Sequence, residues 1–586
     1  MVPEAGVALG PEARREALAR FATETFDVLV IGGGVTGCGI ALDAASRGLT
    51  VALVEKRDFA AGTSSRSSKL IHGGLRYLER FDVGLVREAL HERRLLLEKT
   101  APHLVHATPF LFPLKRHAWD RFYMGSGLFL YDGLAGLHSA VPRHRHLSRR
   151  ACLRHVPALR DDALCGGIRY YDAQMDDSRF VIALVRTAAA HGAVCAAGVH
   201  ATGLLRDGRR IAGAHVQDTE SGAELDLRAR VVVNASGVWT SEVELMAGVD
   251  RPALRVRPSK GIHLVVPKDR IASDYALILP TPKSVLFVLP WNGHWIIGTT
   301  DTDWTHDLDH PAATRADIDY LLEQVNTVLA SPLTRDDVVG VYAGLRPLVS
   351  ADGTDTTKVS RNHEVRRDAP GFVSVAGGKY TTYRVMARDA VDAAAHELAC
   401  PVEASRTADV PLAGAVGLSL TRSRARAHPA AAGLEPARLD RLIGRWGSLA
   451  LEVLDTIAAD PALAAPLPGA GEYLSVEAVY AASHEGALHV DDVLTRRTHI
   501  SFELADRGDG AVEAVARLMA PVLGWDDEAV AREVAHYRAR LAAERKAESM
   551  PDDAASDAVR APVRDLRLRT FPGEPGGTLR TATRQV

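Results

Sequence analysis

Near the start of the chain, two short apolar runs enclose a segment with helical character. Residues 28–31 form a continuous aliphatic run that ends on glycine, which is typical of a parallel strand buried on both faces. A helix is predicted from there to about Arg47, ending at Gly48. A second apolar run at 50–54 predicts the next strand. This order of elements indicates a βαβ unit.

The turn of this unit has the glycine spacing of a dinucleotide-binding loop. Gly32 makes the tight turn, Gly34 lets the backbone approach a pyrophosphate, and Gly37 lets the helix pack on the strand. Glu55 suits a ribose hydroxyl and would repel a 2′-phosphate, and a single such loop early in a chain is typical of FAD enzymes. We therefore predict FAD, contacted here by Gly32, Gly34, Val35, Thr36, Gly37, Glu55 and Lys56.

Later apolar runs predict the remaining parts of the fold. Strands that end in small residues, at 231–240 and 371–384, are expected to return to the cofactor, through Ala235, Gly237, Gly378, Lys379, Thr381 and Thr382. Alternating runs at 255–266 and 276–299 predict an antiparallel sheet with a hairpin near Asn292 and Gly293. From 405 to 545 the pattern is helical.

The predicted fold class is α/β: a Rossmann-like FAD-binding domain, an inserted antiparallel substrate domain and a helical C-terminal domain. The FAD-binding domain is discontinuous within 26–400, at about 26–80, 160–250 and 345–400. The inserted substrate domain takes about 81–160 and 251–345. An extension at 1–25, the helical domain at 405–545 and a flexible tail at 546–586 complete the division.

Composition narrows the possible partners and location. The chain has 586 residues, 47% of them hydrophobic, and a net charge of −3, so no nucleic-acid partner is expected. Five scattered cysteines and no apparent secretory signal indicate reduced thiols in the cytoplasm, and we expect no metal site. No apolar run is long enough to span a bilayer. The basic and aromatic segment 115–150 fits either a membrane surface or a core helix with a basic loop.

Several motifs together resemble one family. They are SSRSSKLIHGGLRYLE at 64–79, RPSKGIHLVVP at 257–267, IIGTTDTDW at 296–304, YAGLRPL at 342–348, AGGKYTTYR at 376–384 and VDDVLTRRTHISFE at 490–503. In this order they resemble the FAD-dependent glycerol-3-phosphate dehydrogenases of the aerobic, respiratory type. The resemblance implies oxidation of sn-glycerol 3-phosphate at C2 to dihydroxyacetone phosphate, with hydride transfer to flavin N5 and electrons passed to a membrane quinone.

The resemblance also implies a cytoplasmic enzyme bound peripherally to the inner face of the cytoplasmic membrane, with a homodimer as one option. Two other enzymatic interpretations stay open. One is a glycerol-3-phosphate oxidase that reduces oxygen to hydrogen peroxide. The other, more distant, is an FAD-dependent amino-acid or amine oxidase, because arginine pairs with a carboxylate as well as with a phosphate.

Site residues follow from the motifs. The expected catalytic residues are His72, Arg346 and Lys379, with His72 as the general base and His263 as the alternative base, since an imidazole titrates near neutrality. The expected substrate contacts are Arg76, Tyr77, His263, Arg346, Arg361 and Lys379. Further FAD contacts are expected from Thr63, Ser64, Ser65, Ser68, Lys69, Leu70, His72, Gly73 and Gly74.

Overall fold

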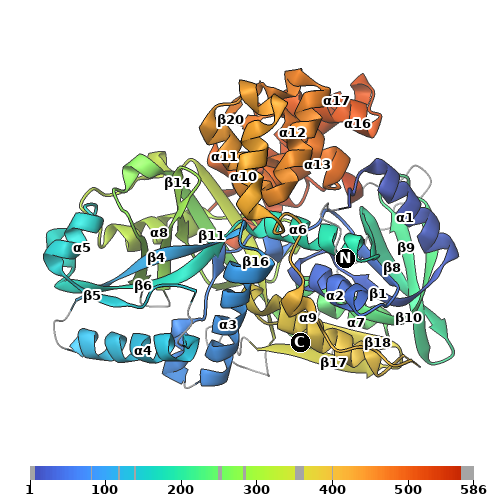
Figure 1. Ribbon diagram of the computed structural model, residues 1–586, viewed down its shortest axis with the longest axis horizontal. Helices are drawn as coiled ribbons and strands as arrows, with labels where there is room; N and C mark the ends of the chain where they lie inside the picture. The colour runs from blue at the N-terminus through green and yellow to red at the C-terminus, as the bar shows by residue number, and fades with distance from the viewer. Residues whose placement is uncertain are drawn as a thin grey trace.

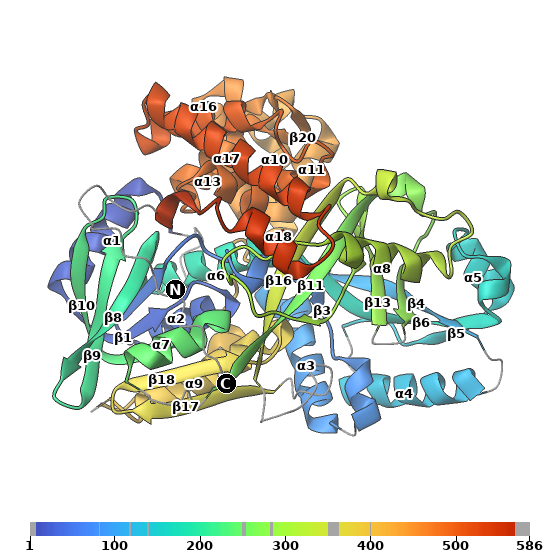
Figure 2. The same ribbon diagram turned by 180° about the vertical axis from the view of Figure 1, so that it is seen from behind.

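The computed structural model describes residues 7–80, 82–115, 119–136, 140–248, 254–281, 285–349, 362–398 and 400–568. Within them, two large sheets lie side by side and a group of helices lies above their junction (Figures 1 and 2). Arg361 and the tail from 569 onward lie outside the described residues. None of the helices that the structure describes is long and apolar enough to cross a membrane.

The first sheet contains the predicted βαβ unit. Its eight strands are β17 (His363–Ala369), β18 (Phe372–Gly377), β10 (Glu224–Asn234), β1 (Thr25–Ile31), β2 (Val51–Glu55) and β7 (Val194–Ala197) in spatial order, followed by β9 (Arg210–Asp218) and β8 (Val199–Asp207) on β10. The strands from β18 to β7 are parallel. All three segments expected to reach the cofactor therefore follow the carboxyl ends of parallel strands in one sheet, and these ends lie on the same side.

Helices and a β-ribbon cover the two faces of this sheet. On one face, α2 (Val35–Ser46) packs between α6 (Asp177–Ala190) and α9 (Tyr383–Ala395), and their apolar side chains form the largest core cluster. On the other face, α1 (Pro11–Thr23), α7 (Thr240–Met246) and the β8–β9 ribbon enclose a second cluster. Burial on both faces explains why β1 and β2 are continuous apolar runs.

The second sheet has ten strands and is antiparallel except where β12 pairs with β4. The strands are β15 (Thr302–Asp303), β11 (Val256–Pro267), β14 (His294–Gly298), β13 (Val285–Trp291), β12 (Ala276–Pro280), β4 (Val105–Leu114), β6 (Gly166–Met175) and β3 (Leu70–Ile71), with β16 (Gly340–Val349) on β11 and β5 (Arg145–Ser148) on β6. The predicted hairpin joins β13 to β14, where Asn292 and Gly293 have positive φ.

The predicted boundaries at 80, 160 and 345 were wrong in detail. β3 and β6, expected in the FAD-binding part, pair with each other and with β4 in the second sheet, and β16 continues there to Val349. The cause is nonlocal pairing, because the apolar pattern of a strand does not say which sheet it joins. The helices on this side are α3 (Val83–Leu95), α4 (Trp119–Ala135), α5 (Arg149–His155) and α8 (Arg315–Asn326).

The C-terminal region is helical, as predicted. It comprises α10 (Leu418–Ala427), α11 (Pro436–Trp446), α12 (Ala450–Ala459), α13 (Ser475–His484), α14 (Val490–Asp492), α15 (Ile500–Glu503), α16 (Val512–Leu523), α17 (Asp527–Ala547) and α18 (Asp553–Arg560), with a small β19–β20 hairpin (Pro466–Leu467 and Ala470–Leu474). The flexible tail expected from 546 was wrong up to 568. Arg560 and Arg567 are 2% and 4% exposed, and Arg567 binds Asp492 at 2.5 Å.

Buried ion pairs hold these helices to the first sheet. The Asp58 carboxylate, which follows β2, accepts hydrogen bonds from Arg497 at 2.7 and 2.8 Å and also pairs with Arg496. Arg179 on α6 makes two bonds of 2.6 Å to Glu485. All five side chains are buried. Because a buried charge without a partner is strongly unfavourable, these pairs fix the position of the C-terminal helices.

Candidate active site

A cavity of about 1050 Å³ lies between the two sheets and reaches the ends of β1, β2, β10 and β18. Most predicted site residues line it: Gly32, Gly34, Val35, Thr36, Glu55, Lys56, Thr63, Ser64, Ser68, Leu70, His72, Gly74, Tyr77, Ala235, Gly237, His263, Arg346, Gly378, Lys379 and Thr381. The predicted residues that do not line it are Gly37, Ser65, Lys69, Gly73 and Thr382. Arg76 lies in the turn Leu75–Arg80, and its side chain is outside the described part.

The glycine loop leaves space that only glycine permits. A Cβ on Gly32, whose φ is +112°, would lie 2.6 Å from the Ala235 carbonyl oxygen. A Cβ on Gly37 would lie 1.8 Å from the Gly32 carbonyl oxygen. Gly37 thus acts through the close packing of α2 on the loop, although it does not face the cavity. The open N-terminus of α2 and the cavity volume fit a bound dinucleotide.

Polar contacts fix the loop around that helix end. The Ser64 hydroxyl accepts a hydrogen bond from the Val35 amide at 2.9 Å, and the Thr63 hydroxyl donates to the Leu345 carbonyl at 2.6 Å. Glu55 accepts from the Gly33 amide at 2.7 Å. The segment 62–68 is therefore tied both to the βαβ unit and to β16, between the two halves of the cavity.

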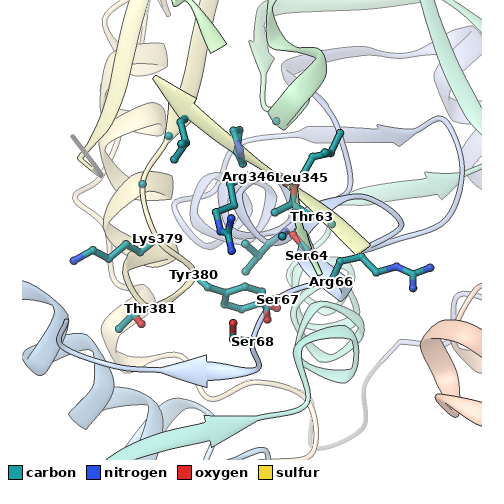
Figure 3. A pocket seen from close by; sticks show the side chains of 18 of the residues that line it. Thr63, Ser64, Arg66, Ser67, Ser68, Leu345, Arg346, Lys379, Tyr380 and Thr381 are labelled. Carbon is teal, nitrogen blue, oxygen red and sulfur yellow. Dashed lines mark hydrogen bonds between the residues drawn. The ribbon is translucent and has the colours of Figure 1, made fainter. Parts of the chain in front are cut away.

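Arg346 reaches the cavity because Gly261, on the neighbouring strand, has no side chain to block its guanidinium. On the paired strands β11 and β16, Gly261 lies opposite Gly344, two pairs along from Ser259 and Arg346 in the direction of His263. A Cβ on Gly261 would lie 2.4 Å from Arg346 Nη2. The Arg346 Nη2 atom donates to Thr299 Oγ1 at 2.9 Å and to the Thr300 carbonyl at 3.1 Å. Figure 3 shows this side chain directed toward Tyr380 and Ser67.

His263 is the buried histidine of the site. Its Nε2 lies 2.8 Å from Ser68 Oγ, and its ring stacks on Tyr342 with centroids 4.7 Å apart. The ring is 2% exposed. Burial, reinforced by Arg346 and Lys69, lowers the pKa of His263 well below its usual value. This lowered pKa favours the neutral form of the imidazole.

His72 and Lys379 also line the cavity, on two segments that contact each other. The His72 amide donates to Thr381 Oγ1 at 3.1 Å. This hydrogen bond ties the segment after β3 to the turn that follows β18. The Lys379 ammonium lies 3.7 Å from the centroid of the Tyr77 ring. In Figure 3 Lys379 points away from Arg346, so the two cations do not converge on one point.

Lys69 lies behind the cavity wall. Its ammonium pairs with Asp177 at 2.5 Å, and both side chains are fully buried. The rings of Trp291, Tyr342 and Phe502 surround it with centroids 4.8, 5.7 and 5.5 Å away. Because Phe502 comes from the C-terminal region and Tyr342 supports His263, this cage links that region to the site.

Sequence patterns did not single out several residues around the site. Thr299, Thr300 and Asp301 lie in the GTTDTDW motif but were not assigned to the site, and they surround the Arg346 guanidinium. Tyr342 lies in the YAGLRPL motif, and its hydroxyl donates to the Ser67 carbonyl at 3.0 Å. The β11–β16 register that brings them together has no local signal in the sequence.

Comparisons with known proteins agree with this geometry. Residues 27–388 match the family model described as FAD dependent oxidoreductase, and the fold and cavity define a member of this class. Residues 405–530 match the model described as C-terminal domain of alpha-glycerophosphate oxidase. The glycerol-3-phosphate dehydrogenase 2 of Mycobacterium tuberculosis is 54% identical over 97% of each chain. The chain belongs to the FAD-dependent glycerol-3-phosphate dehydrogenase family, and its cofactor is FAD.

Two further relatives support the assignment. The human mitochondrial glycerol-3-phosphate dehydrogenase is 38% identical over 86% of this chain and 71% of its own. A solved glycerol-3-phosphate dehydrogenase from Bacillus halodurans, complexed with FAD, superposes with a TM-score of 0.75 at 29% identity. That match covers 91% of this chain and 98% of the other, so it includes the C-terminal helices.

Proposed function

We propose that this enzyme oxidises sn-glycerol 3-phosphate at C2 to dihydroxyacetone phosphate and passes the electrons to a membrane quinone. One observation carries the proposal: a single cavity joins the glycine loop, the Arg346 and His263 pair, and an apolar arm beneath α4. The bound FAD supplies the hydride acceptor. The protein must then bind the phosphate, accept a proton and provide a path for the acceptor.

Arg346 is the proposed phosphate ligand. Its guanidinium forms a planar fork, which matches two oxygens of a phosphate. Thr299 and the Thr300 carbonyl hold Nη2, and Asp301 lies 3.5 Å from Nη1. These contacts orient the fork before the substrate arrives. Lys379 and Tyr77, and Arg76 and Arg361 by family resemblance, are the other proposed contacts.

His263 is the better supported proton acceptor. It is neutral, lies beside Arg346 on the same sheet and is held by Ser68 and Tyr342. Its Nδ1 is buried without a hydrogen-bond partner among the described residues. Burial is the main cause of the lowered pKa of His263, and Arg346 adds to it. A substrate phosphate on Arg346 would offset the contribution of that cation and so make the ring a stronger base. His72 is the alternative base.

Separate variants of the two histidines distinguish these assignments. His263→Asn is expected to lower kcat by roughly 10²–10⁴-fold, the usual range for a lost general base, with a smaller change in KM. His72→Asn is expected to lower flavin content or KM more than kcat. Steady-state kinetics between pH 5.5 and 9 measure both. A larger loss of kcat in His72→Asn would reverse the assignment.

The apolar part of the cavity beneath α4, which we call the apolar arm, supports a quinone as the electron acceptor. It is lined by Phe110, Phe112, Met124, Leu130, Ile278 and Phe287. Glycerol 3-phosphate has no large apolar group that could contact such a surface, whereas a quinone ring and its hydrocarbon tail are apolar and would contact it. Met124 and Leu130 in this lining belong to α4, the helix that also carries the exposed Phe122 and Phe129.

The outer surface of α4 supports peripheral membrane binding. Phe122 and Phe129 are 71% and 76% exposed, so this helix is not a core helix. Exposed basic side chains are nearby at Lys115, Arg143, Arg145, Arg149 and Arg150. Aromatic side chains flanked by cations suit the boundary of an anionic bilayer. A homodimer remains a separate expectation.

The first test is anaerobic mixing of the yellow holoenzyme with glycerol 3-phosphate, followed near roughly 450 nm, where protein-bound flavin absorbs. Rapid bleaching that glycerol does not cause would support the substrate and its phosphate. The absence of bleaching in a flavin-loaded sample would contradict the proposal. Addition of a quinone analogue or of oxygen then identifies the acceptor, and stoichiometric peroxide would instead indicate an oxidase.

A further inference from the structure

A second, smaller cavity lies where the C-terminal helices meet the segment 62–68 and β16. Its volume is about 60 Å³, and we call it the junction cavity. Its charged lining consists of Arg57, Arg66, Arg496, Arg540, Arg560, Asp309, Asp491, Glu544, Glu548 and Asp565. Of these, Asp309 is paired with Lys56 at 2.8 Å and Asp565 with Arg567 at 3.4 Å. Figure 3 shows that the Arg66 side chain points away from Arg346 and Ser68, toward the C-terminal region.

Two guanidinium groups of the junction cavity lack full partners. Arg66 has no side-chain hydrogen bond or ion pair with any residue that the structure describes. Arg560 is 2% exposed, and its Nε and Nη1 atoms have no hydrogen-bond partner within the described ranges. Only its Nη2 lies near a carboxylate, 3.4 Å from Glu544. Arg66 is partly exposed, whereas buried donors such as those of Arg560 are normally satisfied.

The surrounding carboxylates are already engaged. Asp491 pairs with Arg540 at 2.8 Å and Arg496 at 3.1 Å. Glu548 makes a two-pronged contact with Arg507. Glu544 is shared at 3.4 and 3.6 Å between Arg560 and Arg540. Burial lowers the pKa of Arg66 to about 10, as expected for a cation whose charge is incompletely balanced.

The size of the junction cavity sets the size of the missing partner. A water molecule needs roughly 10–15 Å³ of cavity volume, so 60 Å³ accommodates about four to six non-hydrogen atoms. Phosphate and sulfate have five. We propose that the junction cavity binds a small tetrahedral oxyanion of the inorganic phosphate class between Arg66 and Arg560.

Bound there, the anion ties α18 to the segment that contacts the cofactor. Arg66 follows Ser64, which accepts from the first turn of α2, and Thr63, which donates to β16. The anion would accept charge-assisted hydrogen bonds from both guanidinium groups, and such bonds are about twice as strong as neutral ones. Phosphate should therefore stabilise the holoenzyme as well as bind to it.

Equilibrium dialysis of the holoenzyme with radiolabelled phosphate tests this site. Saturating dihydroxyacetone phosphate blocks the substrate site without reducing the flavin, and ionic strength is held constant with chloride. We expect one phosphate to remain per chain and to be displaced by sulfate. The absence of bound phosphate under these conditions would overturn the proposal. The blocking step rests on the proposed function. Bound phosphate that is lost in Arg346→Lys but retained in Arg66→Met and Arg560→Met would therefore place it in an unblocked substrate site and overturn the junction-cavity proposal.

Variants locate the bound phosphate. Arg560→Met should weaken phosphate binding at least tenfold and abolish the increase in thermal midpoint that phosphate gives to the wild type. Arg66→Met should have the same two effects. It is the variant to measure if Arg560→Met loses flavin or fails to fold. Arg335→Met replaces an exposed arginine paired with Asp319 and should change nothing. Equal binding by the wild type and a folded variant at either position would overturn the assignment.

Discussion

At the residue scale, Arg346 shows how one position serves the site only because a neighbour is glycine. Its guanidinium lies across Gly261, and a side chain there would collide with Nη2. Arg346→Lys should lower kcat/KM for glycerol 3-phosphate by about 10–100-fold, mainly through KM, because lysine cannot present a two-pronged donor.

Steady-state kinetics with a soluble acceptor measure this loss, and Arg335→Lys is a matched control at an exposed position. A KM within twofold of the wild type would place the substrate phosphate elsewhere in the cavity. The same experiment with glycerol as substrate should show little difference between the proteins, because glycerol has no phosphate.

His103 gives a prediction about pH and stability at the same scale. It is 6% exposed, and burial lowers its pKa from about 6.5 to about 3. The unfolded chain therefore binds a proton below pH 6.5 while the folded protein does not. The stabilisation is complete above pH 6.5 and is lost as the pH falls from there toward 3.

Between pH 7 and 5 this single group should cost about 2 kcal/mol of folding free energy. His103→Gln cannot titrate, so its unfolding free energy should fall less over that interval. Urea unfolding at the two pH values measures the difference. An identical pH dependence in wild type and variant would mean that His103 is protonated in the folded state.

At the scale of elements, the βαβ unit was predictable and the strand partners were not. Residues 25–55 form a local pattern in which each apolar run and glycine has one plausible role. By contrast, β3 and β6 have apolar patterns that suit either sheet, and only pairing over long sequence distances assigns them. The segment 546–568 appeared disordered because its buried side chains are mostly polar or charged (Ser556, Arg560, Asp565 and Arg567), and such residues are usually exposed.

The candidate site was likewise predictable only in part. His72, His263, Arg346 and Lys379 were recognisable in motifs, and all line the cavity. Their relative positions were not predictable. Arg346 and Lys379 point apart, and His263 lies beside Arg346 only because of the β11–β16 register. Lys69 was expected at the cofactor from its motif but lies in an aromatic cage behind the wall.

The close packing of α2 on the glycine loop yields a prediction for that element. Gly37→Ala would bring a methyl group within 1.8 Å of the Gly32 carbonyl oxygen, so α2 must shift from the loop. We expect the purified variant to retain less than a tenth of the flavin, measured as absorbance per chain, because the shift displaces the helix end that faces the pyrophosphate.

Gly444→Ala is the matched control, since Gly444 lies within α11 and a Cβ there meets nothing within 4 Å. It should retain full flavin and be slightly stabilised, by up to about 1 kcal/mol. Full flavin content in Gly37→Ala would mean that the loop adapts without loss of the site.

At the scale of the whole molecule, α4 and the C-terminal helices lie at opposite ends (Figures 1 and 2). If α4 meets the bilayer, Phe122→Ser combined with Phe129→Ser should lower binding to anionic phospholipid vesicles by at least tenfold, because two exposed rings no longer insert. Sedimentation with vesicles measures binding, and activity with a soluble acceptor should be retained.

Leu420→Ser provides the control for this experiment. Leu420 is 63% exposed on α10, at the other end of the molecule, so its replacement should leave vesicle binding unchanged. Equal losses in both proteins would indicate a nonspecific effect of surface hydrophobicity. Unchanged binding by the α4 variant would assign membrane contact to another surface.

The buried contact between Asp58 and the arginine pair has a consequence for how such enzymes can change over generations. A recombination event near residue 405 that exchanged the C-terminal region for an unrelated one would leave the Asp58 carboxylate buried without its cations. The two parts are therefore inherited together, and a lineage can replace one only if the substitution restores the opposite charges at the same step.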